Sequence, residues 1–377
     1  MHVLFFVNCV TAACRARRNN ARYDDPAGRK TALLLADYLV ALGHSVEIFS
    51  PSYAKMRDGA WSEEPAAGVR VWHAPTFALG RWAPLRQKQA AAHFRRRVRQ
   101  HAGRKDVLVL GLNYHDEYAA AMLCAHACGL KTVIVYRDGI FLDPEWQTPR
   151  GLAHERAVYA AVDACLVANT GLSDRVQAVS GRTIPSLLQP ALVDLRLLAQ
   201  HRNDPAPGCQ RILYTGNFGH EQGFAQLCQW IEHLPPELEL DITGRGEKDE
   251  VVVLQKLLVN HSNARYHGFL ADTAFEKIFS SADACLLLHN PDSPYFHTQF
   301  PSKFYDYLSR NKRIVTAPDT RLDSFRHLPH LIVVEDFPRG LASLLALLRR
   351  TPPPTAAGVL ALAEELRQQL GDFLGRI

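Results

Sequence analysis

Short apolar runs alternate with helix-length segments along most of the chain, and this alternation limits the possible folds more than any other feature. In the first half the runs are HVLFFVN, SVEIFS, VRVWHA, DVLVLGL, KTVIVY, DACLVA and TIPSLLQ. Segments such as RKTALLLADYLVAL and DEYAAAMLCAHAC lie between them with helical periodicity. This order is typical of an α/β fold, in which a parallel sheet carries helices on both faces.

The alternation stops and restarts, which predicts two Rossmann-like domains. Residues 194–209 are polar and proline-rich and are predicted to link an N-terminal domain, 1–193, to a C-terminal domain, 210–355. The second set of runs is RILYTGNFG, LELDITGRGE, ARYHGFL, DACLLLH, RIVTA and LIVVE. After the break TPPPTAAG, residues 356–377 are predicted to contain a final amphipathic helix. The length of 377 residues also exceeds what one core usually supports.

Composition predicts an ordinary globular protein, with 47% hydrophobic and 21% charged residues. The first apolar run is short and follows no basic leader, and no apolar run reaches the ~18 residues of a membrane span, so we expect a cytosolic protein. The eight cysteines lie mostly in apolar runs and are interpreted as small core residues, including the pair in CAHAC, 124–128. No compact cluster of metal-ligand residues is found, and no metal is expected.

Glycine-rich turns follow two strands of the second half, where ligands of parallel sheets bind. GNFG begins at Gly216 and GRG at Gly244, and each precedes a helix whose N–H groups could meet an anion. Ordinary turn chemistry explains such glycines equally well. A third stretch, FPSKFYDYLSR, places Lys303 before a helix and Asp306 on its first turn.

These motifs, in this order, resemble the nucleotide-sugar domain of GT-B glycosyltransferases, specifically the bacterial retaining (family 4 type) enzymes of polysaccharide assembly. The resemblance rests on YTGNFGHEQGF, LELDITGRGE, YHGFL, SSADACLLLH and FPSKFYDYLSRNKRIVTA and covers most of residues 210–320. GHSVEIFSPS and VDACLVANTGLSDRV are similar to the family's N-terminal domain. The resemblance implies a GT-B fold, with two Rossmann-like domains facing each other across a cleft and the C-terminal helix returning to the N-terminal domain.

The resemblance also implies a donor site in the C-terminal domain. Asp306 would accept hydrogen bonds from the ribose hydroxyls, since a carboxylate offers two acceptors to a diol. Lys303 and Arg245 would meet the diphosphate. In the simpler interpretation, the negative charge of Asp306 only stabilises the N-terminus of its helix, and Lys303 is a solvated surface charge. The full set of predicted donor-binding residues is Gly216, Asn217, Gly219, Gly244, Arg245, Phe269, Pro301, Ser302, Lys303 and Asp306.

Residues after two strands of the N-terminal domain would face the acceptor. Asn113 and His115 occur in LGLNYHDE, and Arg137 and Asp138 occur in VYRDG. By resemblance, His115 or Asp138 would orient the acceptor hydroxyl or act as a base, and Asn113 and Arg137 would line the cleft. A lone histidine at a helix start is more often a solvated cap.

The predicted activity is transfer of a sugar from a nucleotide-diphosphate donor to a hydroxyl of a glycan or lipid-linked acceptor, with retention and without a cofactor. Three departures from the family pattern leave two alternatives open. Thr298 stands where many relatives carry a second glutamate, Asp306 replaces glutamate, and Gln222 replaces a basic residue. The alternatives are a noncatalytic protein that binds a nucleotide sugar or a partner, and a nucleotide-sugar epimerase.

Basic residues concentrate in the N-terminal half, although the net charge is only +5. Residues 81–105 contain nine Lys or Arg and no acid, and CRARRNNAR, 14–22, adds four arginines. Arg95, Arg96, Arg97 and Arg99, with Trp82, Leu85 and Phe94 as apolar anchors, predict docking on the anionic inner membrane surface. A solvated helix is the plainer interpretation, and nucleic acid is not expected because no accompanying motif occurs.

Overall fold

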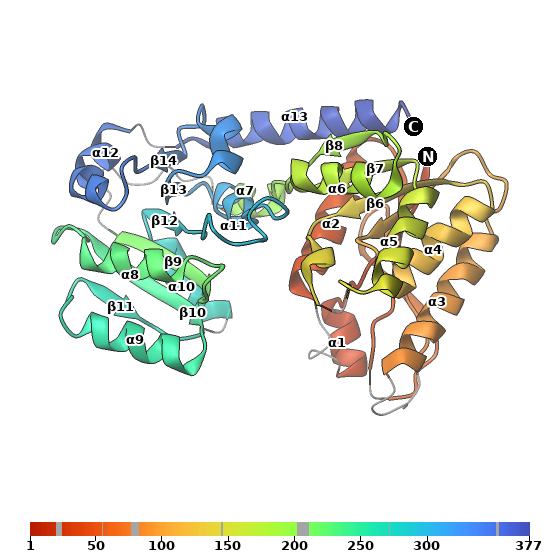
Figure 1. Ribbon diagram of the computed structural model, residues 1–377, viewed down its shortest axis with the longest axis horizontal. Coiled ribbons are helices and arrows are strands. Elements are labelled where there is room, and N and C mark those ends of the chain that lie inside the picture. The colour runs from red at the N-terminus through yellow and green to blue at the C-terminus, as the bar shows by residue number, and fades with distance from the viewer. Residues whose placement is uncertain are drawn as a thin grey trace. The chain divides into compact units, whose positions relative to one another are not determined.

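The computed structural model describes residues 1–19, 25–54, 56–76, 83–144, 146–201, 211–270, 272–351 and 354–377. They form two compact α/β units (Figure 1). Unit 1 comprises Met1–Leu192, His297–Gln299 and Glu365–Ile377, and unit 2 comprises Val193–Phe296 and Phe300–Glu364. Each unit has a mainly parallel sheet, as the alternation of the sequence predicts.

The sheet of unit 1 has the strand order β3-β4-β2-β1-β5-β6-β7-β8. Its strands are β1 (His2–Phe6), β2 (Ser45–Ser50), β3 (Trp61–Ala66), β4 (Val69–His73), β5 (Val107–Leu112), β6 (Lys131–Tyr136), β7 (Ala164–Val167) and β8 (Ser186–Leu188). Only β3 runs antiparallel to its neighbour among these strands, and the sequence pattern missed it. The polar run WSEEPA includes Pro65, which an edge strand tolerates because one side of its backbone has no strand partner.

The helices of unit 1 are α1 (Ala12–Arg18), α2 (Pro26–Ala41), α3 (Ala83–Arg99), α4 (Asp116–Ala127), α5 (Pro149–Ala161) and α6 (Thr170–Ser180), with a 3-10 turn, η2 (Ile140–Leu142). Helices α3 and α4 lie side by side (Figure 1). Helix α3 buries Phe94 and Val98, and Met122 of α4 packs against Gly111 of β5. Phe94 is therefore a core residue, and its prediction as a surface anchor is wrong; Trp82 lies outside the described residues.

The sheet of unit 2 is wholly parallel in its described strands, with the order β11-β10-β9-β12-β13-β14. Its strands are β9 (Arg211–Asn217), β10 (Glu239–Arg245), β11 (Ala264–Tyr266), β12 (Ala284–Leu287), β13 (Arg313–Thr316) and β14 (Leu331–Val333). The chain changes direction across the sheet between β9 and β12, where the carboxyl ends of parallel strands leave space for a ligand.

Helices cover both faces of this second sheet. They are α7 (Leu195–Gln200), α8 (Phe224–Glu232), α9 (Lys248–Leu258), α10 (Asp272–Ser281), α11 (Lys303–Leu308) and α12 (Leu344–Arg350), with 3-10 turns η3 (Thr320–Phe325) and η4 (Arg339–Ser343). One core joins Trp230 of α8 and Leu254 of α9 to Ile212, Tyr214 and the other residues on that face. On the opposite face, the rings of Phe279 and Tyr307 lie 6.0 Å apart.

The last helix, α13 (Ala356–Leu374), divides between the units, with its residues from Glu365 onward in unit 1. Its Gly371 lies close to Leu42, at the end of α2: a β-carbon at Gly371 would lie 2.9 Å from Leu42 Cδ2. Leu370 is fully buried and Phe373 nearly so. The C-terminal part of α13 therefore contributes to the core of unit 1.

The described cysteines are mostly core residues, as expected. Cys9, Cys14, Cys124, Cys165 and Cys285 are buried, and Cys128 and Cys228 are half-buried. Cys209 lies outside the described residues. In the described part of the chain, no helix has both the length and the apolar character needed to cross a membrane.

Candidate functional site

Two glycines bring the ends of β9 and β10 unusually close together. Gly216 and Gly244 are paired in the sheet and have φ values of +132° and +148°. A β-carbon on Gly244 would lie 1.7 Å from the Gly216 carbonyl oxygen, so a larger residue would force the backbones apart. The glycines predicted as donor-binding are therefore required by the backbone itself, and they leave peptide groups without side-chain cover.

The ammonium group of Lys303 lies over Gly216. A β-carbon on Gly216 would lie 2.1 Å from Lys303 Nζ, and the same nitrogen is 5.1 Å from the centroid of the Tyr214 ring. Desolvation lowers the pKa of Lys303 to about 8, so the side chain is mostly protonated at neutral pH. A cation held at the end of β9, close to open backbone, is suited to a phosphate group.

A second cation stands at the end of β10. The guanidinium carbon of Arg245 lies 3.6 Å from the centroid of the Phe269 ring, and Phe269 is 63% exposed. Cation–π contact of this kind fixes the direction of an exposed arginine. The sequence predicted both residues as donor-binding, but only the structure shows that they form one stacked pair.

Helix α11 presents Asp306 one turn after Lys303. The helix is anchored by its buried aromatic residues: the Tyr307 hydroxyl lies 3.1 Å from Thr215 Oγ1 of β9, and the Phe304 and Phe325 rings are 4.8 Å apart. Asp306 is half-buried in the first turn, as the sequence predicts. Because α11 has only six residues, its dipole is small, and the positive charge here comes mainly from Lys303.

The remaining predicted donor residues surround this centre. Asn217 is exposed at the end of β9, and Gly219 has φ +135° in the following turn. Gln222 lies beside Gly219, with Cγ 4.0 Å from the position of a Gly219 β-carbon. Pro301 is buried and Ser302 is exposed before α11.

Two histidines near the same turn were not singled out from the sequence. His289 follows β12, and its backbone nitrogen lies 3.1 Å from where a β-carbon on Gly223 would be. Burial, assisted by the charges of Arg321 and Lys303, lowers the pKa of His289 to about 4 and keeps it neutral. His220 accepts a hydrogen bond of 2.8 Å from Asn290 Nδ2. The sequence did contain a signal for them, because His289 follows a strand and His220 lies in a glycine-rich turn.

In unit 1, the four residues predicted for the acceptor side lie after β5 and β6. Asn113 is buried with φ +50°, and its side-chain oxygen accepts a hydrogen bond of 2.8 Å from the Arg137 backbone nitrogen. Arg137 in turn donates to the carbonyl oxygens of Gln189 and Pro190. Asn113 and Arg137 therefore hold two strand ends together.

Asp138 is the stronger candidate of the two predicted catalytic groups. Asp138 is exposed to solvent after β6, and the protein atoms packed around it raise its pKa, while a hydrogen bond with Asn113 and the charges of Arg137 and His115 oppose the rise. His115 stands at the N-cap of α4, where its side chain makes no capping hydrogen bond to the described residues. The two side chains are thus close enough for their charges to interact.

Thr298, one of the departures noted in the sequence, is buried in unit 1 and packs against Gly139. A β-carbon on Gly139 would lie 2.4 Å from Thr298 Oγ1. Thr298 therefore occupies the space that a side chain at position 139 would need.

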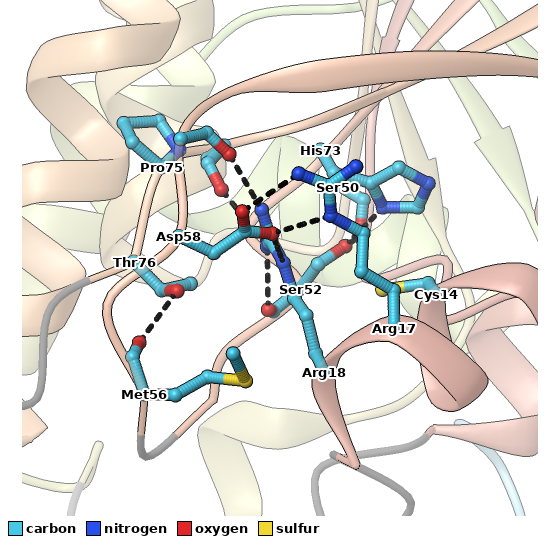
Figure 2. A network of polar contacts seen from close by, with 12 residues as sticks. Cys14, Arg17, Arg18, Ser50, Ser52, Met56, Asp58, His73, Pro75 and Thr76 are labelled. Atoms are coloured by element: carbon cyan, nitrogen blue, oxygen red, sulfur yellow. Dashed lines mark hydrogen bonds and ion pairs between the residues drawn. The ribbon is translucent and has the colours of Figure 1, made fainter.

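A polar network in unit 1 shows that part of the predicted basic surface is structural. The stretch CRARRNNAR forms helix α1 as far as Arg18, which is fully buried. Arg18 donates to Asp58 at 2.9 Å and to the carbonyl oxygens of Ser52, Gly59 and Ala74, and Arg17 also pairs with Asp58 (Figure 2). Arg17 and Arg18 therefore bind the loop after β2, and the buried Arg18 is not part of the basic surface.

The same region contains a hydroxyl–imidazole–carboxylate chain. Ser52 Oγ lies 2.7 Å from His73 Nδ1, and His73 Nε2 lies 2.6 Å from Glu63 Oε1. Such an order is found in hydrolases, but Ser52 and His73 have no exposed surface. Because a substrate cannot reach the hydroxyl, this chain has a structural role and secures the edge strand β3.

The arginines of α3 point to different surroundings. Arg95 and Arg99 line a groove with α4, Arg96 is exposed, and the Arg97 guanidinium carbon lies 4.3 Å from the centroid of the Trp72 ring. The four predicted membrane-facing residues therefore have three different surroundings. Within the described ranges, no three His, Cys, Asp or Glu side chains are placed to hold a metal ion.

Comparison with known proteins agrees with this architecture. Residues 27–186 match the family described as the glycosyl transferase 4-like domain. Sucrose-phosphate synthase from Thermosynechococcus elongatus is similar over 100% of this chain and 98% of that chain, with a TM-score of 0.61 and 13% identity. The chain has the GT-B fold of glycosyltransferases. The GT-B fold predicted from the motifs is therefore confirmed.

Two further GT-B structures are similar along their whole length. An E. coli structure described as trehalose-6-phosphate bound with UDP-2-fluoro glucose has a TM-score of 0.64 and 10% identity, with 100% of this chain and 98% of that chain covered. Anabaena Alr3699/HepE in complex with UDP has a TM-score of 0.61 and 14% identity, with both chains fully covered. No curated protein sequence matched this GT-B chain.

Proposed function

We propose that this protein transfers a hexose from a UDP-sugar to a hydroxyl of a glycan or lipid-linked acceptor, with retention of configuration. The observation that supports the proposal is the ammonium group of Lys303 over Gly216, which is paired with Gly244 at the ends of β9 and β10. This arrangement offers a fixed cation and open backbone to a diphosphate, at the carboxyl ends of the strands where ligands of such sheets bind.

The choice of UDP rests on similar structures. Anabaena Alr3699/HepE is described in complex with UDP and with UDP-glucose, and the E. coli structure is described with UDP-2-fluoro glucose. The donor would occupy unit 2, with its ribose at Asp306 and its diphosphate at Lys303 and Arg245. As the bond to the sugar breaks, these two cations would stabilise the negative charge of the leaving UDP, and no metal ion would be needed.

Asp138 and His115 would act on the acceptor. The pKa of Asp138 is raised by desolvation, which brings a carboxyl group closer to the range useful for proton transfer at neutral pH. Asp138→Asn and His115→Gln should lower kcat and leave the dissociation constant of UDP nearly unchanged, as expected for groups that meet the acceptor.

The test is incubation of the purified protein with UDP-, GDP- and dTDP-sugars, with and without acceptors, while nucleoside diphosphate release and donor structure are followed. UDP release from a UDP-sugar supports the proposal. Binding without release would favour the noncatalytic alternative, and an isomerised donor would favour the epimerase. Lys303→Met should abolish release, whereas the exposed Glu237→Gln should not.

We also propose that the protein acts in the cytoplasm at the anionic inner membrane surface, where a lipid-linked acceptor would be presented. The basic residues of α3 support this proposal, since each can contribute about 1 kcal/mol near such a surface. Replacing Arg95, Arg96, Arg97 and Arg99 together by glutamine should reduce sedimentation with anionic vesicles. If the parent protein does not sediment with these vesicles at low salt, the membrane-docking proposal is wrong.

A further inference from the structure

A groove of about 850 Å³ lies between α3 and α4, and Arg150 and His154 of α5 also line it. Its rim carries four cations, Lys88, Arg95, Arg99 and Arg150. The structure gives these four side chains no carboxylate ion-pair partner among the described residues. The one lining carboxylate, Asp116, lies 3.7 Å from His154 Nε2. The groove is thus strongly positive.

The apolar part of the lining forms the floor of the groove. It consists of Ala91, Ala120, Leu123, Cys124 and Ala127, and all of these except Leu123 have small side chains. Small residues on two adjacent helices leave a trough between them. A cationic rim above an apolar floor matches an amphiphile, with an anionic head and a hydrocarbon chain.

We propose that this groove binds one anionic phospholipid molecule, with its phosphate at Arg95 and Arg99 and part of an acyl chain on the alanine floor. Two guanidinium groups four residues apart on one helix repel each other, and a phosphate between them relieves the repulsion through paired hydrogen bonds. The inference deepens the proposed membrane docking, because it assigns a discrete site in place of diffuse surface charge.

The dimensions fit a hydrocarbon chain. Lys88 and Arg99 are eleven residues apart on α3, which corresponds to about 16 Å along the helix axis. The volume also lies within the roughly 300–1,000 Å³ typical of small-molecule sites.

The experiment uses the full chain with dodecyl phosphate below its micelle concentration and with inorganic phosphate. Calorimetry should show that dodecyl phosphate binds about tenfold or more tightly than inorganic phosphate. The half-buried Cys128, which lines the groove, should react more slowly with iodoacetamide when the amphiphile is present, as followed by peptide mass spectrometry. Equal affinity for both ligands would show a free-phosphate site and overturn the lipid assignment.

Two variants that lose the same charge separate the groove from the surrounding surface. Arg95→Gln with Arg99→Gln should weaken dodecyl phosphate binding about tenfold or more. Arg96→Gln with Lys105→Gln, at exposed positions outside the groove, should leave it unchanged. Equal losses in both double variants would overturn the proposal in favour of diffuse attraction.

A third variant tests where the hydrocarbon chain of the amphiphile binds. Ala127→Leu adds bulk at an exposed position on the floor without changing charge, so it should fold and should weaken dodecyl phosphate but not inorganic phosphate. Unchanged amphiphile binding would show that the hydrocarbon chain does not lie on this floor and would overturn the proposal. UDP affinity, measured alongside, should stay constant in every variant, so failure here is distinguishable from failure of the donor site.

Discussion

Lys303 and Asp306 stand less than one helical turn apart but are predicted to meet different parts of the donor. Lys303 lies over Gly216, whereas Asp306 is half-buried on the first turn of α11. Each chemical group suits its proposed partner: a point charge suits a diphosphate, and a carboxylate suits a diol. At this scale, the proposal can be tested one side chain at a time.

Asp306→Ala should weaken UDP binding by about 1.5–3 kcal/mol, because a charged acceptor of two hydroxyl groups is lost. Calorimetry with UDP and with 2′,3′-dideoxy-UDP measures the effect. The dideoxy nucleotide should bind the parent protein and the Asp306→Ala variant with equal affinity, since it lacks the ribose hydroxyls. If Asp306→Ala leaves UDP affinity unchanged, Asp306 does not bind the ribose; Glu237→Ala is the matched control for charge.

UDP binding should weaken about tenfold between pH 7 and pH 9, because the pKa of Lys303 is about 8 and only the protonated amine attracts the diphosphate. The diphosphate should hold the proton in the complex, so affinity is full below pH 8 and is lost as the pH rises above it. Uridine binding should not vary with pH over this range. Lys303→Met should bind UDP weakly at both pH values; an equally steep pH dependence in this variant would contradict the assignment.

At the scale of elements, the site depends on how strand ends meet. The carboxyl end of β10 tolerates only glycine at position 244, because the Gly216 carbonyl oxygen occupies the place of a β-carbon. Helix α11 is too short to hold its own position and depends on the contacts of its aromatic residues with β9 and with Phe325. Strand pairing and aromatic packing thus position the donor residues.

Gly244→Ala should destabilise unit 2 by on the order of 3 kcal/mol or more, since it adds a backbone clash to an unfavourable φ. Gly103→Ala is the control, because Gly103 has φ +77° with open space around its α-carbon and should cost only about 1 kcal/mol. Urea unfolding measures both changes. Similar losses for the two variants would show that the close approach of β9 and β10 is unimportant.

The two glycines within α13 should respond differently to alanine. Gly358→Ala should raise stability by about 1 kcal/mol, because helix propensity improves and the new methyl group meets nothing within 4 Å. Gly371→Ala should raise stability by a smaller amount or lower it, since its methyl group would lie 2.9 Å from Leu42 Cδ2. Thermal unfolding compares them, and an equal gain would argue against close packing of α13 on Leu42.

At the scale of the whole molecule, the chain ends in the unit in which it begins. Residues from Glu365 onward belong to unit 1, although unit 2 precedes them in the sequence. The stability of unit 1 therefore depends on residues more than 300 positions from its first strand.

Leu370→Ala should destabilise unit 1 by about 2–5 kcal/mol, because a fully buried side chain is removed. Hydrogen exchange should show faster exchange in unit 1, including α2, with less change in unit 2. Leu360→Ala, at a position that is 41% exposed in the same helix, is the control and should have little effect. Faster exchange confined to unit 2 would contradict the assignment of this segment to unit 1.

The sequence by itself determined two parallel sheets, most of their strands and the glycine-rich turns, because strand and helix periods are local properties. It also placed Asp306 correctly on the first turn of a helix. It missed β3 and α1, whose polar and arginine-rich segments lack an apolar period. These elements are stabilised by partners distant in sequence, such as β4 and Asp58.

Only the tertiary structure decided which side chains meet. It placed Lys303 over Gly216, 87 residues away, and packed Thr298 against Gly139. It also divided the arginines of α3 between a groove and the Trp72 ring. The physical reason is that such contacts depend on strand order and helix packing, which bring together segments whose local patterns carry no information about each other.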